Sequence, residues 1–194
     1  MRRGVPPGRH SPEGFGDVLR EVWLAPGKFF GGLNTEGLPI RPALFASFVL
    51  YLNLLFEELL RAAWRLEFNY GLLYAALPGL VVSLVLAPLL VAALSALVLT
   101  VLDGAPSRSK FGPVFRALGY GTAIGIVFWI PYAPLLALPY GLYVATVAVK
   151  EALLISWIRA ATATLVPLAA VLLIILLLTG PDEAFRLLIN PPGE

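Results

Sequence analysis

The chain has 194 residues, of which 59% are hydrophobic and only 13% are charged, and its formal net charge is +2. A soluble globule of this size could not bury so much apolar surface, and a disordered chain would carry more charge. The apolar residues form long continuous runs, which excludes a β-barrel, and the absence of cysteine excludes disulfides and thiolate chemistry. The composition therefore predicts an all-α, multi-pass membrane protein.

Residues 1–14 are predicted to form a disordered basic tail. The tail begins with Arg2 and Arg3 and is rich in proline, and no apolar run follows that could serve as a signal peptide. The only histidine of the chain, His10, lies in this tail.

Residues 15–33 carry an apolar face at helical spacing, formed by Phe15, Val18, Leu19, Val22 and Trp23. We predict an amphipathic interfacial helix that lies on the cytoplasmic leaflet. The alternative is a short helix packed under the membrane bundle. The expected anchors at the membrane interface are an aromatic residue, a cation and two further aromatic residues, namely Trp23, Lys28, Phe29 and Phe30.

Residues 38–180 are predicted to form a bundle of five transmembrane helices, because each span needs ~20 apolar residues. The spans are expected near residues 38–60, 78–102, 115–134, 138–158 and 160–179, followed by a short outer tail over 181–194. Pro78 is expected to begin the second span, and Pro88 to kink it. For the last stretch, the alternative is two spans with a re-entrant piece around residues 131–149.

The distribution of Lys and Arg predicts the topology. With five spans and the N-terminus inside, only Arg61, Arg65 and Arg186 lie on the outer side, and the other eleven of the 14 cationic residues lie on or near the inner side. This bias favours a cell-membrane protein with a cytoplasmic N-terminus and an outer C-terminus. We attribute the excess positive charge to cytoplasmic loops and not to nucleic-acid binding.

Gly121 and Gly125 form a G-x-x-x-G pair in the third span and are expected to allow close packing of two helices. The pair is better suited to packing within the chain than to dimerisation. The tripeptide 119–121 resembles part of a potassium-channel filter, but the residues before it are Ala and Leu and not the Thr-Val of such filters.

Lys150, Glu151 and Arg159 are the charged residues of the last apolar stretch and form a candidate intramembrane polar site. Lys150 and Glu151 fall past the middle of the expected fourth span, where a charge is expensive and often functional. The alternative is a structural ion pair, or a helix that ends earlier than expected.

No enzyme motif is present: the chain lacks H-E-x-x-H, G-x-S-x-G and P-loop sequences. We therefore expect no catalytic residue, no metal site and no cofactor.

Three short segments, in this order, are similar to those of the Yip1-domain family. Residues 23–30 (WLAPGKFF) resemble a W-x-x-P-x-x-F-F segment of bacterial members. Residues 116–123 (RALGYGTA) resemble the R-x-L-G-Y-[SG]-T region, although Ile124 stands where the family commonly has proline. The later residues are similar at 129–131 (WIP) and at 156–160 (SWIRA). The resemblance covers residues 15–180.

This resemblance implies five helices and a cytosolic N-terminus. Eukaryotic relatives act in vesicle traffic and contact small GTPases through a longer acidic N-terminal region, whereas the segment before residue 15 is short and basic here. We expect a non-enzymatic protein that organises the membrane or scaffolds partners, in contact with the bilayer and with a protein partner or a second copy. The alternative is a transporter, or a transporter subunit, that uses Lys150 and Glu151.

Overall fold

The computed structural model describes residues 14–34, 39–65 and 76–179, and all regular structure in these ranges is helical. The elements, in chain order, are α1 (Phe15–Leu24), α2 (Pro26–Gly32), α3 (Ile40–Arg65), α5 (Pro78–Asp103), α6 (Arg108–Gly121), η1 (Thr122–Val127), α7 (Ala133–Leu153) and α8 (Trp157–Thr179). The predicted all-α class is confirmed. The predicted outer tail, and the basic tail except for Gly14, lie outside the described residues.

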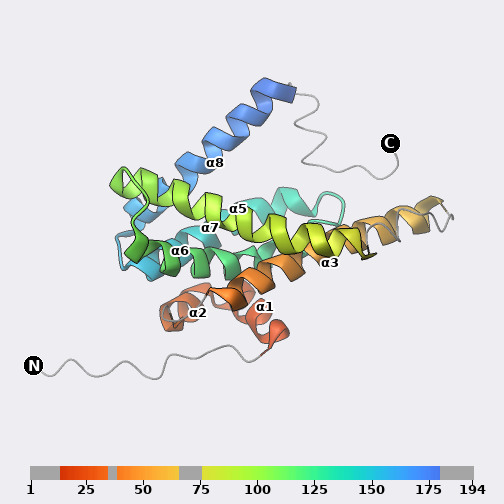
Figure 1. Cartoon of the computed structure of the whole chain (residues 1–194), viewed down its shortest axis with the longest axis horizontal. Helices are drawn as coiled ribbons and strands as arrows, with labels where there is room; N and C mark the ends of the chain where they lie inside the picture. Colours follow the sequence, from red (N-terminus) through yellow and green to blue (C-terminus); the bar gives the residue numbers. More distant parts are fainter. Residues whose placement is uncertain (1–13, 35–38, 66–75, 180–194) are drawn as a thin grey trace, which may run out of the picture.

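Three helices in the described ranges are long and apolar enough to cross a membrane: Ile40–Ala63, Pro78–Asp103 and Ala133–Leu153. In Figure 1, α3, α5 and α7 run lengthwise, α8 diverges from them on one side, and α1 and α2 lie on the other. These helices confirm a membrane protein. They do not by themselves establish five spans, because the third and fifth expected spans do not meet the same criterion in the described residues.

The third expected span, 115–134, differs most from the structure. Its α-helix begins earlier, at Arg108, and ends at Gly121, after which η1 continues as a 3₁₀-helix. Glycine and β-branched threonine favour the α-helix weakly, and the hydroxyl of Thr122 donates to the carbonyl of Gly119 at 2.6 Å. Pro131 follows, so the α-helical pattern cannot resume before α7.

The fourth expected span, 138–158, lies five residues too late at each end. Pro134 is in the first turn of α7, where its missing N–H costs nothing, and Pro139 is accommodated inside the helix. Leu154 ends α7 in the left-handed conformation (φ 53°), and the backbone N–H of Ile155 donates to the carbonyl of Lys150 at 3.2 Å. Because α7 is continuous over Ala133–Leu153 and long and apolar enough to cross a membrane, it gives no support to the alternative with a re-entrant piece.

The helices α5 and α8 agree more closely with the spans expected from the sequence. Pro78 begins α5 as expected, and the helix continues through Pro88 to Asp103. The last helix begins at Trp157, three residues before the expected start.

The N-terminal segment forms two helices in place of the expected single helix. Ala25 breaks it with φ −147° and ψ 57°, outside the α-helical region that the ring of the following Pro26 disfavours. The apolar face of α1 is covered by protein, since Val18 is 3% exposed and Val22 is 0% exposed. The expected interfacial helix is therefore not confirmed, and the segment packs against the bundle.

Candidate functional site

The predicted charged site lies at the end of a helix. Lys150 Nζ donates to Glu151 Oε1 at 2.5 Å, and both residues sit in the final turn of α7 with side chains 37% and 23% exposed. A Cβ on Gly31 of α2 would lie 3.6 Å from Glu151 Oε2, so the pair meets the N-terminal segment. Arg159 is exposed in the first turn of α8, and no ion pair within the described residues joins it to the other two. Lys150 and Glu151 were expected past the middle of a span over 138–158. Because α7 ends at Leu153, they lie in its last turn.

The predicted glycine pair does not make the close helix contact. A Cβ on Gly121 would meet nothing within 4 Å, and one on Gly125 would lie in ordinary contact with Val49, at 3.7 Å. The close approach is at Gly119, where a Cβ would lie 2.9 Å from Pro42 Cβ and 3.1 Å from the Pro42 carbonyl oxygen. Gly119 is the residue that lets the start of α3 touch α6.

Most of the predicted membrane anchors are core residues. Phe29 is 6% exposed and Phe30 is 3% exposed, and the ring of Phe29 packs edge-on against Tyr120 with centroids 5.6 Å apart. The indole N–H of Trp23 donates to the carbonyl of Ala123 at 3.1 Å. Lys28 is exposed. These aromatic side chains attach α1 and α2 to the bundle and are not directed at lipid.

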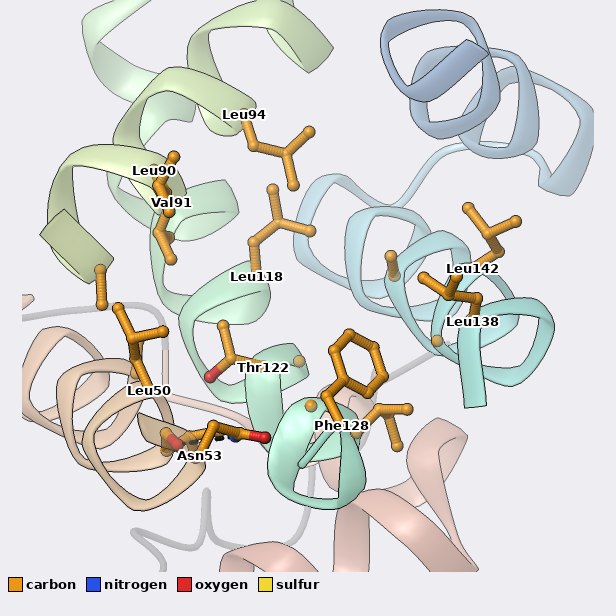
Figure 2. Close-up of a pocket in the computed structure, with 18 of the residues that line it drawn as sticks. Leu50, Asn53, Leu90, Val91, Leu94, Leu118, Thr122, Phe128, Leu138 and Leu142 are labelled. Atoms are coloured by element: carbon orange, nitrogen blue, oxygen red, sulfur yellow. Dashed lines mark hydrogen bonds between the residues drawn. The ribbon is translucent and has the colours of Figure 1, made fainter. Parts of the chain in front are cut away.

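The described part contains an apolar cavity of about 520 Å³ between α3, α5, α6, η1, α7 and α8. In Figure 2, side chains of α5 lie on one side of the cavity and side chains of α7 on the other, with Leu118 between them. The labelled apolar residues of these two walls are Leu90, Val91, Leu94, Leu138 and Leu142.

The polar groups at the cavity are mostly engaged elsewhere. Asn53 donates to the carbonyl of Val49 at 2.9 Å and accepts the backbone N–H of Trp129 at 3.0 Å, which ties α3 to the turn after η1 (Figure 2). Glu57 pairs with Arg61. The cavity therefore presents hydrocarbon, with few polar atoms left to orient a polar ligand. The sequence analysis did not single out Asn53, although a polar amide inside an apolar span indicates a buried hydrogen-bonding role.

The cavity is not lined by the predicted charged residues, and the described residues hold no cluster of metal ligands. Within the described ranges, no three side chains of His, Asp or Glu gather as metal ligands. Lys150, Glu151 and Arg159 are not among the residues that line the cavity.

Apolar helices of membrane-spanning length around a hydrocarbon-lined cavity define the chain as a multi-pass membrane protein. The family model of the Yip1 domain matches residues 20–179, so the chain belongs to the Yip1 domain family. No curated protein and no solved structure matches it. The transporter alternative gains no support from these findings, because the charged pair that motivated it lies at a helix end.

Proposed function

We propose that this chain is a non-enzymatic membrane scaffold that organises the bilayer and its partners, as expected for a trafficking-type Yip1 protein. The single observation that supports this function is the apolar cavity among the long helices. A solute pathway would need polar groups along the interior, whereas this wall is hydrocarbon.

The occupant that best suits the cavity is one acyl chain of a bilayer lipid. Its volume of about 520 Å³ falls within the range of small-molecule sites, roughly 300–1,000 Å³. Three turns of a partner helix, about 10 Å wide and 16 Å long, would need roughly twice this space. Hydrocarbon is also the solvent at this depth of the membrane, so no polar group has to be desolvated.

We further propose five crossings, with α6 and η1 together as the third and α8 as the fifth. The cationic residues Arg41, Arg108, Lys110, Lys150 and Arg159 then belong to the cytoplasmic side of the cell membrane. This topology has a cytoplasmic N-terminus and an outer C-terminus.

A pair of glycines in α6 provides the test of the occupant. A Cβ on either Gly121 or Gly112 would meet nothing within 4 Å, but only Gly121 lines the cavity. We expect Gly121→Leu to fill the cavity and to reduce, severalfold, the phospholipid retained by the purified protein in native mass spectrometry. Gly112→Leu is the matched control and should retain lipid like the wild type.

Thermal unfolding separates loss of lipid from loss of fold. Gly121→Leu should unfold at or above the wild-type temperature in detergent, because its Cβ meets nothing within 4 Å and the rest of the side chain adds apolar contacts in the cavity. Unchanged lipid retention in a folded Gly121→Leu protein would refute the acyl-chain site.

A further inference from the structure

Arg116 is a buried cation, and two of its three guanidinium nitrogens have no hydrogen-bond acceptor in the part of the chain that the structure describes. It lies in α6 within a run of buried residues, and it is 6% exposed. Its Nε and Nη1 atoms are inaccessible, and neither finds a hydrogen-bond acceptor among the described residues. A buried charge without a partner is strongly destabilising, so this guanidinium calls for an anion.

Two further groups converge on the same place. Tyr120 lies one helical turn after Arg116, is 7% exposed, and its phenol interacts electrostatically with both Arg116 and Arg41. Arg41 is exposed in the first turn of α3, which contains no acidic residue. The contact of Pro42 with Gly119 presses this turn onto α6.

The backbone adds to the positive potential. The N-terminal end of a helix carries a partial positive charge, equivalent to about half an elementary charge. The start of α3 therefore contributes its field beside two guanidinium groups. Such a combination binds anions and repels cations.

From this arrangement we propose that Arg116, Arg41 and Tyr120 form a binding site for a phosphate group, supplied by the headgroup of an anionic membrane phospholipid. Guanidinium groups match phosphate in geometry, with several N–H donors in one plane, and the phenol supplies one more donor. None of the three residues lines the apolar cavity, so this site is independent of the acyl-chain proposal.

The position of the site favours a lipid phosphate. Arg41 stands at the beginning of the membrane-spanning part of α3, the level at which headgroups lie. Basic pockets between transmembrane helices at this level bind anionic headgroups. Free phosphate has the same chemistry, and the experiment distinguishes the two sources.

The test measures thermal unfolding of the purified full chain in a neutral detergent. The added probes are phosphatidylglycerol, phosphatidylcholine and inorganic phosphate, each in separate titrations. We expect phosphatidylglycerol to raise the unfolding temperature of the wild type in a saturable way, and phosphatidylcholine to do so much less. If inorganic phosphate raises the unfolding temperature as much as phosphatidylglycerol does, the phosphate site stands, but its ligand is free phosphate and not a lipid headgroup.

Arg116→Met is the decisive variant. It removes the buried charge and keeps an unbranched side chain, so the lipid-free protein should be at least as stable as the wild type. Its apparent affinity for phosphatidylglycerol should fall about tenfold or more, as expected when a charged hydrogen-bond partner is lost. Arg41→Gln should weaken the affinity less, because that residue is exposed.

Arg108→Gln is the matched control, since Arg108 is an exposed arginine in the first turn of the same helix. It should respond to lipid like the wild type at 150 mM salt, where exposed charges are screened. Equal lipid responses of Arg116→Met and Arg108→Gln would overturn the proposal. Glu36 is the acidic residue nearest before α3 in the sequence and lies outside the described residues. If lipid-free Arg116→Met and Glu36→Gln proteins both unfold well below the wild type, an internal carboxylate pairs with Arg116 and the proposal is overturned.

Discussion

Gly119 shows how one missing side chain sets the distance between two helices. The Cα of Gly119 faces Pro42 so closely that a Cβ would lie 3.1 Å from the Pro42 carbonyl oxygen, which belongs to the backbone and cannot rotate away. Because α6 carries Tyr120 next to this contact, the same glycine also positions the ring of Tyr120 against Phe45, with centroids 5.5 Å apart.

We expect Gly119→Ala to lower the free energy of unfolding by about 1–3 kcal/mol, the cost of overpacking a tight contact. Gly112→Ala in the same helix should change it by less than about 1 kcal/mol, because alanine favours the helix and meets no other element there, while the ring of the following Pro113 offsets part of that gain. Chemical or thermal unfolding in detergent measures both. Equal effects of the two substitutions would show that the approach to Pro42 is not tight.

The sequence predicted the type of residue that packs helices closely, but not the position of that residue. Glycines were expected to mediate packing, but the spacing of Gly121 and Gly125 could not reveal that Gly119 is the one facing another helix. That depends on how α6 is rotated against α3, a property of packing between distant segments. The charges of Lys150 and Glu151 were placed too far from a helix end because the expected fourth span, 138–158, begins and ends five residues later than α7.

At the scale of elements, α1 and α2 act as a brace along α3, η1 and α7. Phe15 of α1 contacts Phe45 and Phe48 of α3, with ring centroids 4.9 Å and 4.7 Å apart. At the other end of α1, the hydroxyl of Tyr140 donates to the carbonyl of Trp23 at 2.6 Å. The sequence predicted one helix here where the structure has two, and it could not show what covers the apolar face, because a helix buried on protein and one buried in lipid share the same periodicity.

Tyr140→Phe should loosen this brace without unfolding the bundle. Loss of the hydrogen bond to Trp23 costs about 1 kcal/mol, so local opening and amide exchange over residues 15–24 should rise about fivefold. Hydrogen exchange followed by mass spectrometry measures this directly. Tyr143→Phe, one turn later on α7 and 46% exposed, should leave the exchange unchanged. A similar increase in both variants would show that the ring and not the hydroxyl holds α1.

At the scale of the whole molecule, apolar and polar surfaces lie on different flanks. Large apolar residues are exposed along α5 and α8, as at Val81 (63%) and Leu177 (75%). On the side of α1, the residues that face outward include Asp17, Arg20 and Glu21. In Figure 1 these flanks lie on opposite sides of the long helices. The exposed apolar side chains along α5 and α8 offer surface on which lipid can pack.

The proposed topology places the α5–α6 connection inside and the turn before α7 outside. Because the native chain contains no cysteine, Ser109→Cys and Tyr132→Cys each introduce a unique thiol. A membrane-impermeant maleimide on intact cells should label Tyr132→Cys and spare Ser109→Cys, and both should react after permeabilisation. Labelling of Ser109→Cys alone would reverse the orientation.

The docking of α1 also has a consequence for the order in which the protein is assembled. The partners of Trp23 lie 100 and 117 residues later in the chain, at Ala123 and Tyr140. At roughly 5–20 residues per second, synthesis of the second partner follows that of Trp23 by roughly 6–23 seconds. During this interval the Trp23 end of α1 lacks both of its hydrogen-bond partners, whereas Phe15 at the other end can already meet Phe45 and Phe48 of α3. The end of α1 at Trp23 can therefore dock only after η1 and α7 have been made.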